Sequence, residues 1–228
     1  MKKYRAVLID IDGTLLDFEK AECRGVQAVM KLYGVVPDHN KVARYQEINQ
    51  NFWRRYEKGE ITRAQISEGR YPMFFGEMGV TVDPEECERL YRQHVDSLII
   101  LIDGAKELCH YLAGKYLLYA ATNGYSKSQR ERLRQAELYD YFQDIFVSQD
   151  TGSQKPQKEF FDYCFARMPG DISREEMIMI GDGLTSDIEG GIRAGIHTCW
   201  FNQSGKKNET GIQPDFEVKT LEEIKKIL

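Results

Sequence analysis

The sequence predicts an α/β protein with a doubly wound parallel sheet and an inserted helical subdomain. Short apolar runs without polar alternation are typical of parallel strands that are buried on both faces. Amphipathic stretches separate the later runs, and this strand–helix alternation indicates βαβ units. The first gap between runs reads as helix over about a hundred residues, whereas a crossover needs only about a dozen residues plus its helix.

Five apolar runs, rich in Val, Ile, Leu, Tyr and Met, have the length of buried strands. They span Arg5–Ile9, Leu117–Ala121, Ile145–Ser148, Met177–Ile180 and His197–Phe201. Amphipathic stretches between the last four predict helices at Ser126–Ala136, at about Gln157–Arg167 and at Ser186–Ala194. We expect Ser126 to cap the first of these helices, because serine is a preferred capping residue.

The long gap contains four stretches with helical spacing, separated by short breaks that carry Gly or Pro. They span Phe18–Tyr33, Lys41–Lys58, Arg63–Met78 and Pro84–Leu98. We therefore expect a discontinuous core made of residues 1–17 and 100–228, and a separate helical subdomain made of residues 18–99.

Composition and charge argue against several classes of partner. The net charge of -5 disfavours a broad basic surface for a nucleic acid polymer or an anionic membrane, but permits a small phosphorylated ligand. The five dispersed cysteines and four scattered histidines favour free thiols over disulfides or a zinc site. No apolar run reaches the roughly 18 residues of a membrane span, and the first residues do not resemble a signal peptide. We expect a cytoplasmic protein.

Polar side chains follow four of the predicted strands. Asp10 and Asp12 follow the first, the tripeptide TNG at 122–124 follows the second, and Lys155 lies in the loop after the third. Asp182 and Asp187 follow the fourth. The carboxyl ends of parallel strands meet at one edge of the sheet, so we expect these groups to lie close together.

Such a cluster of acids calls for a cation. Two carboxylates about 4 Å apart repel by roughly 4 kcal/mol at an effective dielectric constant near 20. A divalent ion would offset this repulsion, and oxygen ligands without histidine favour Mg²⁺ over zinc.

Phosphoryl transfer uses this set of groups. A carboxylate can attack phosphorus to form an aspartyl-phosphate, while Mg²⁺ and a lysine offset the charge of the phosphoryl group. A hydroxyl such as that of Thr122, with backbone N–H groups, can hold the phosphoryl oxygens. A second acid protonates the leaving alkoxide and later deprotonates water. One strand end would thus carry a nucleophile and a proton shuttle.

The segments DIDGTLLD, TNG, the QKP lysine and GDGLTSD resemble, in order and spacing, the four motifs of the haloacid dehalogenase-like (HAD) hydrolase superfamily. The helical insert resembles the C1 cap of that superfamily. The resemblance implies that Asp10 is the nucleophile, that Asp12 is the general acid/base, and that Thr122 and Lys155 bind phosphate and orient Asp10. Because the namesake dehalogenases lack the second acid, the presence of Asp12 favours a phosphatase.

The same resemblance implies a metal site and substrate contacts. The Mg²⁺ ligands would be Asp10, the backbone carbonyl of Asp12, Asp182, and Asp187 either as a direct ligand or just behind the direct ligands. Asn123 and Gly124 would contact the substrate.

The segments YQEINQNFWRRYEKGEITRAQISEGR and SDIEGGIRAGIHTCWFN resemble bacterial nucleotidases of this superfamily that act on pyrimidine nucleoside monophosphates. A nucleotide is therefore the expected partner. Asn49 could hydrogen-bond the edge of a base, and Phe52, Trp53 or Tyr56 could stack on it. The spacing of these three aromatic residues is equally typical of a helical core.

Two other kinds of function stay open from the sequence, and a third, the receiver domain, does not fit it. A sugar-phosphate phosphatase or a phosphomutase of the same superfamily would use the same catalytic groups. A signalling receiver domain also carries acids, a Thr or Ser and a Lys on a doubly wound sheet, but it is about half this length and its phosphorylated Asp lies later in the chain. A phosphate-binding regulatory protein without activity would not need every catalytic group, and all are present here.

Overall fold

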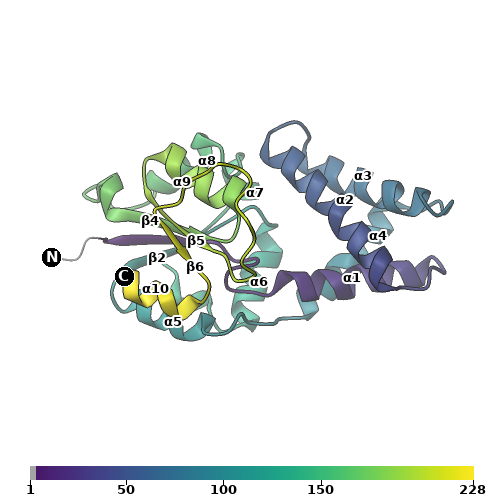
Figure 1. Cartoon of the computed structure of the whole chain (residues 1–228), viewed down its shortest axis with the longest axis horizontal. Coiled ribbons are helices and arrows are strands. Elements are labelled where there is room, and N and C mark those ends of the chain that lie inside the picture. Colours follow the sequence, from purple (N-terminus) through teal and green to yellow (C-terminus); the bar gives the residue numbers. More distant parts are fainter. Residues whose placement is uncertain (1–3) are drawn as a thin grey trace. The chain divides into compact units, whose positions relative to one another are not determined.

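A computed structural model describes residues 4–228 of the chain (Figure 1). Residues 1–3 lie outside the described residues. They begin the N-terminal segment that was expected not to be a signal peptide. The chain divides into two compact units: a core unit, Met1–Asp17 with Ile100–Leu228, and a helical unit, Phe18–Ile99. Among the described helices, none is both long and apolar enough to cross a membrane.

The core unit is built on a six-stranded parallel sheet, and the predicted α/β class is confirmed. The strands are β1 (Ala6–Ile9), β2 (Leu117–Thr122), β3 (Asp144–Val147), β4 (Met177–Gly181), β5 (His197–Phe201) and β6 (Phe216–Val218). Their order is β3-β2-β1-β4-β5-β6. The chain winds in one direction from β1 to β3 and in the other from β4 to β6, which makes the end of β1 a topological switch point where ligands bind in such sheets.

Helices cover both faces of this sheet. The core unit contains α5 (Ala105–Ala113), α6 (Ser126–Gln135), α7 (Ser148–Thr151), α8 (Lys158–Phe165), α9 (Glu189–Ala194) and α10 (Leu221–Ile227). Helices α8 and α9 pack on one face, while α5 and α10 pack together on the other (Figure 1). Phe160 and Phe161 of α8 are fully buried against strand residues such as Phe146, which forms one layer of the core. Short 3-10 turns occur at Tyr139–Tyr141 and Arg174–Glu176.

The five expected strands are present, and the structure adds elements that were not expected. These are the edge strand β6 and the helices α5, α7 and α10. The helix expected at 186–194 begins instead with a π-helical turn, Leu184–Ile188, and continues as α9. The expectation that Ser126 caps α6 is wrong: Tyr125 occupies the capping position, and the Ser126 hydroxyl donates to Asp150 at 2.8 Å.

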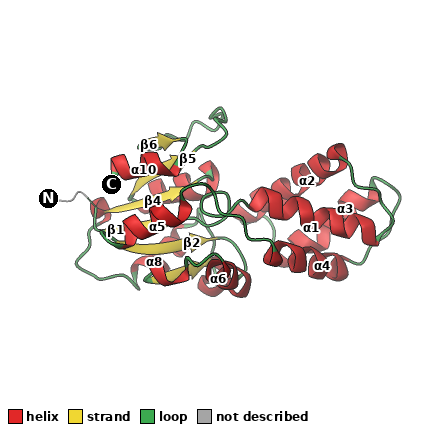
Figure 2. Cartoon of the chain, turned by 90° about the horizontal axis from the view of Figure 1, so that it is seen from below, coloured by secondary structure: helices red, strands yellow, loops and turns green. Residues whose placement is uncertain are grey.

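The helical unit consists of four helices and their connecting loops (Figure 2). They are α1 (Phe18–Leu32), α2 (His39–Glu57), α3 (Arg63–Gly76) and α4 (Pro84–Ser97). Helix α1 packs on α4 and α2 packs on α3. Local sequence signals set their starts: Asp38 caps α2, Thr62 forms a capping box with Gln65 at the start of α3, and Asp83 caps α4 ahead of Pro84.

The aromatic residues considered as base contacts belong largely to the interior of the helical unit. Phe52 and Tyr56 are buried in its hydrophobic core. Trp53 is half-buried at the margin of that core and meets the ring of Tyr56 edge-on, with centroids 5.8 Å apart.

A buried polar network links all four helices of this unit. The Asn49 amide donates to Glu22 and accepts a hydrogen bond of 2.6 Å from Arg70, which also pairs with Glu88. Arg70 is only 1% exposed, and rings of Tyr71 and Tyr91 lie 4.7 Å from its guanidinium. These contacts pair Nη1 and Nη2 of the buried charge, while Nε has no hydrogen-bond partner among the described residues.

The two carboxyl groups of the network have very different pKa values. Burial raises the pKa of Glu22 to about 7, although the Asn49 hydrogen bond and the Arg70 charge oppose the rise. Burial acts in the same direction on Glu88, but the charges of Arg70 and Arg92 outweigh it and hold the pKa of Glu88 at about 2.

We expect Glu22→Gln to flatten the pH dependence of thermal stability. A carboxyl whose pKa is higher in the folded state stabilises the fold while it is protonated, and this contribution is lost as pH rises from about 4.5 towards 7. Gln keeps an acceptor for Asn49 and carries no charge. The Tm of the wild type should fall relative to that of Glu22→Gln between pH 5 and pH 8. Glu19→Gln, an exposed change on the same helix, is the control, and parallel Tm profiles for all three proteins would contradict the prediction.

Candidate active site

The carboxyl ends of three adjacent strands bring the predicted residues together. Strand β1 lies between β2 and β4, with Ile9 opposite Ala120 on one side and Ile180 on the other. Asp10 follows β1 and continues the ladder, because its N–H donates to the Ile180 carbonyl at 2.9 Å. Thr122 is the last residue of β2, and Asp182 follows β4 directly. The sheet therefore sets these residues side by side at one edge.

Lys155 joins two of the carboxylates. Its ammonium donates to Asp10 Oδ1 at 2.8 Å, to Asp187 Oδ1 at 2.6 Å and to the Ala121 carbonyl at 2.6 Å. Lys155 is 1% exposed, yet the charges of Asp10 and Asp187 outweigh burial and raise its pKa. The lysine is thus a fixed cation whose three donors all have acceptors.

Asn123 holds the loop that carries this lysine. Its side-chain amide donates to the Lys155 carbonyl and accepts from the Lys155 N–H, both at 2.9 Å. The amide is therefore occupied by the backbone of Lys155. The predicted contact of Asn123 with substrate stays a prediction, and the same holds for Gly124.

Three acids converge on one point. Oxygen atoms of Asp10, Asp182 and Asp187 lie within 4.8 Å of one another. Burial raises the pKa of Asp10 well above its usual range, and the neighbouring Asp187 and Asp182 add to this effect while Lys155 opposes it. Burial and the charge of Asp187 raise the pKa of Asp182 to about 7. One lysine cannot balance three carboxylates, so the cluster fits a divalent cation that prefers oxygen ligands.

Backbone and hydroxyl groups orient Asp182. Its N–H donates to Thr14 Oγ1 at 3.1 Å, and its carbonyl accepts from Trp200 Nε1 at 2.9 Å. Gly13 has φ of 79°, and a Cβ at this position would lie 2.5 Å from Asp182 Oδ2. Glycine is required here on both grounds, because the left-handed conformation and the close carboxylate exclude a side chain.

Gln129 links Asp12 to Thr122, and Arg132 also bonds Asp12. Neither residue was predicted from the sequence. Gln129 Nε2 donates to Thr122 Oγ1 at 2.9 Å and to Asp12 Oδ2 at 2.6 Å. Arg132 Nη1 donates to Asp12 Oδ1 at 2.6 Å. Helical spacing could have shown that Gln129 and Arg132 share a face of α6. It does not distinguish Arg132 from Arg130 or from the other charged residues of that helix.

The remaining predicted residues lie in the helical unit. Asn49 is buried and its amide is bonded to Glu22 and Arg70, whereas Trp53 keeps part of its surface exposed. Their predicted contacts with substrate stay predictions.

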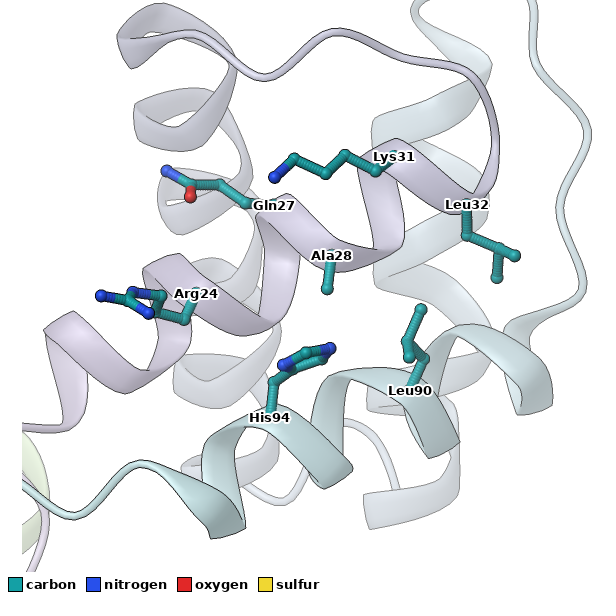
Figure 3. A pocket seen from close by; sticks show the side chains of 7 residues that line it. All are labelled: Arg24, Gln27, Ala28, Lys31, Leu32, Leu90 and His94. Atoms are coloured by element: carbon teal, nitrogen blue, oxygen red, sulfur yellow. The ribbon is translucent and has the colours of Figure 1, made fainter.

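A groove of about 510 Å³ also lies between α1 and α4 of the helical unit (Figure 3). Ala28 and Leu32 face Leu90 and His94 across it, and Arg24 lies at one end. Its lining offers basic and apolar groups but no carboxylate. It is therefore distinct in chemistry from the acid cluster of the core unit.

The parallel sheet, together with the site formed by Lys155 and the three acids of the core unit, is that of a hydrolase with a Rossmann-like core. The chain belongs to the haloacid dehalogenase-like hydrolase family, whose family model matches residues 4–195. This confirms the family that the four motifs predicted.

Three relatives match over nearly the whole chain. The HAD-hydrolase YfnB of Bacillus subtilis is 42% identical over 228 residues, covering 100% of this chain and 97% of that protein. Its crystal structure bound to magnesium has a TM-score of 0.94 at 41% identity, covering 100% of this chain and 99% of that chain. The pyrimidine 5'-nucleotidase PynA of Streptococcus pneumoniae is 33% identical over 222 residues, which are 97% of this chain and 93% of that protein. The pyrimidine 5'-nucleotidase YjjG of Escherichia coli is 31% identical over 226 residues, which are 99% of this chain and 98% of that protein. The chain is thus an enzyme, a phosphoric monoester hydrolase.

We expect Lys155→Met to destabilise the metal-free protein strongly. The change leaves the buried carboxylates of Asp10 and Asp187 without their cation, and breaking a buried pair in this way costs about 3–5 kcal/mol. Adding Asp187→Asn should recover part of the loss, because one uncompensated charge is removed. Urea unfolding in EDTA measures both effects. Lys158→Met is the control, since Lys158 forms an exposed pair with Asp162. A double variant no more stable than Lys155→Met would contradict the prediction.

Proposed function

We propose that this enzyme is a Mg²⁺-dependent 5'-nucleotidase that hydrolyses pyrimidine nucleoside monophosphates through an aspartyl-phosphate on Asp10. The observation that carries the proposal is the Lys155 ammonium between Asp10 and Asp187 in a cluster of three acids. Two relatives that match nearly the full chain are pyrimidine 5'-nucleotidases, and this supports the choice of substrate.

Asp10 is the proposed nucleophile. Within the described residues, 4–228, Lys155 is the donor to the Asp10 carboxylate, and it bonds to Oδ1. This bond orients the carboxylate and leaves Oδ2 to attack phosphorus. The C–O bond of the carboxylate persists while a new O–P bond forms and the bond from phosphorus to the leaving oxygen breaks.

The acid cluster is the proposed magnesium site. Asp10, Asp182, Asp187 and the backbone carbonyl of Asp12 would hold the ion. Mg²⁺ supplies electrostatic stabilisation of the phosphoryl charge when it is bound. The three carboxylates fit it because they are hard oxygen donors that share one point and exceed the charge of Lys155.

Thr122 is a proposed donor to a phosphoryl oxygen. Its hydroxyl oxygen accepts from the Gly124 N–H at 3.1 Å and from Gln129 Nε2 at 2.9 Å. A hydroxyl accepts two hydrogen bonds and donates one. Its proton is therefore available for the substrate. The ammonium of Lys155 adds positive charge nearby.

Asp12 is the proposed general acid and base. It would protonate the nucleoside 5'-oxygen as that group leaves, and then take a proton from the water that attacks the aspartyl-phosphate. Its side chain keeps 26% of its surface exposed, in contrast to the buried Asp187, so it can exchange protons with solvent and substrate.

The helical unit is proposed as the cap that reads the leaving group, with residues 1–17 and 100–228 as the catalytic core. The core groups described above act on the phosphoryl group, on the leaving oxygen or on water, so base recognition needs other residues. Asn49 is buried, and its amide already bonds to Glu22 and Arg70, so it is less accessible to a base than Trp53. Trp53 is therefore the stronger candidate for stacking on a base.

Phosphate release from a panel of nucleoside monophosphates and sugar phosphates tests the proposal. We expect the highest kcat/KM on pyrimidine nucleotides, dependence on added Mg²⁺, and loss of activity in EDTA. Asp10→Asn should lower kcat by more than about a hundredfold, because an amide is a poor nucleophile. A preference for sugar phosphates would replace the substrate assignment, and an active Asp10→Asn variant would remove the nucleophile.

We expect Trp53→Ala to raise KM for UMP by about tenfold, since base–aromatic stacking contributes roughly 1–3 kcal/mol. KM for a small aryl phosphate should change little. Steady-state kinetics on both substrates make the comparison, with folding checked by thermal melts. Leu32→Ala, a change of an exposed side chain in the same unit, is the control. If KM rises equally for the two substrates, Trp53 does not read the base.

A further inference from the structure

We propose that Arg132 and Gln129 of α6 are positioning residues that hold the Asp12 carboxylate for proton transfer. This inference rests on the proposed function, because it concerns the step in which Asp12 exchanges a proton with the leaving group and with water. Both residues bond the side chain of Asp12, whereas the proposed contribution of Asp12 to metal binding is its backbone carbonyl, so the role inferred here differs from metal binding.

The three side chains form a closed ring of hydrogen bonds. Arg132 Nη1 donates to Asp12 Oδ1 at 2.6 Å and to Gln129 Oε1 at 3.2 Å. Gln129 Nε2 donates to Asp12 Oδ2 at 2.6 Å. Each oxygen of Asp12 is therefore tied to a different side chain, which fixes both the position of the carboxylate and its rotation.

This arrangement leaves Asp12 able to exchange a proton. A carboxylate offers about four acceptor sites on its two oxygens. The ring uses two of them. The other sites, together with the exposed part of the side chain, are open to a leaving oxygen or a water molecule.

Burial indicates that the ring serves a purpose other than stability. Gln129 is 1% exposed and Arg132 is 2% exposed, while the Asp12 side chain is 26% exposed. Burying an arginine beside a carboxylate gives little net stability, because desolvation offsets the attraction. An apolar residue would fill the same space at least as well. Placing Asp12 is what the buried guanidinium achieves and an apolar residue could not.

Gln129 also connects proton transfer to phosphate binding. The same Nε2 that donates to Asp12 lies 2.9 Å from Thr122 Oγ1. Gly124 makes room for this amide, since a Cβ on Gly124 would lie 2.2 Å from Gln129 Nε2. One amide thus sets the distance between the residue that serves the leaving oxygen and the residue that donates to the phosphoryl group.

Neighbouring arginines on α6 provide matched controls. Arg130 pairs with Asp150 at 3.1 Å, and Arg134 pairs with Glu131 at 3.9 Å on the surface. The Arg134 side chain is 50% exposed. Arg134→Met removes the same charge and a similar volume from the same helix without touching Asp12.

The test compares leaving groups in the Arg132→Met, Arg132→Lys and Arg134→Met variants. The substrates are UMP, whose 5'-oxygen needs a proton to leave, and p-nitrophenyl phosphate, whose nitrophenolate leaves without one. Rapid-quench measurement isolates the first chemical step. For Arg132→Met we expect at least about a tenfold loss on UMP and less than about a threefold loss on the aryl ester, because general acid catalysis is worth about a hundredfold or more. KM for UMP should stay within about twofold.

Arg132→Lys should recover part of the rate on UMP, because it restores a cationic donor without the planar fork. Arg134→Met should match the wild type on both substrates. If Arg132→Met does not fold at the assay temperature, Arg132→Lys takes its place in the test. Its loss of rate on UMP is then compared with its loss of rate on p-nitrophenyl phosphate. Equal losses on both substrates, or none, in a folded Arg132 variant of an active enzyme would overturn the positioning role alone. A wild type that releases phosphate from neither substrate would overturn the proposed function, and the inference with it.

Discussion

The buried ammonium of Lys155 is the interaction on which the site depends. Two carboxylates with exposures of 8% and 0%, Asp10 and Asp187, come from the ends of different strands and would repel one another without a cation. Lys155 reaches both and also the Ala121 carbonyl at the end of β2. It thereby connects the loop after β3 to the carboxyl ends of β1, β2 and β4. The negative charge that it leaves unbalanced is the reason why the cluster is proposed as a site for a divalent cation.

The parallel sheet converts distance in the sequence into proximity in space. Residues 10, 122 and 182 are far apart along the chain, but the register of β1 with β2 and β4 puts them at one edge. This explains why the sequence alone predicted most of the acid–lysine cluster. Each residue of the cluster follows an apolar run that is long enough to be predicted as a strand. Because the carboxyl ends of parallel strands lie at one edge of the sheet, these residues are expected to lie close together.

Other parts of the molecule could not be predicted in this way. Strand β6 has only three residues, Phe216–Val218, and a run so short carries no pattern. Gln129 and Arg132 contact Asp12 only because of how α6 is rotated about its axis, and its sequence SKSQRERLRQ offers three arginines with similar local surroundings. The bonds of Asn49 to Glu22 of α1 and Arg70 of α3 could not be predicted either, because no local pattern reports a contact between helices, and its expected contact with a base stays a prediction.

Both units bury cations, and their surroundings differ in a way that supports the proposed catalytic use of those in the core unit. Arg70 in the helical unit lies against the rings of Tyr71 and Tyr91 and beside Glu88, whose low pKa shows a carboxylate kept ionised by its partners. Every group around Arg70 belongs to the interior of the helical bundle, so its contacts specify packing. Lys155 and Arg132 in the core unit instead face carboxylates that follow β1, the central strand at the topological switch point. A buried cation contributes little net stability to a fold, because its desolvation offsets its attraction to a carboxylate. At the end of β1 it has a second effect, which is to fix two acids of one short segment, Asp10 and Asp12, by independent contacts. Such separate anchoring suits the proposed roles of Asp10 as a nucleophile and Asp12 as a proton shuttle, which would act on different atoms of the same substrate.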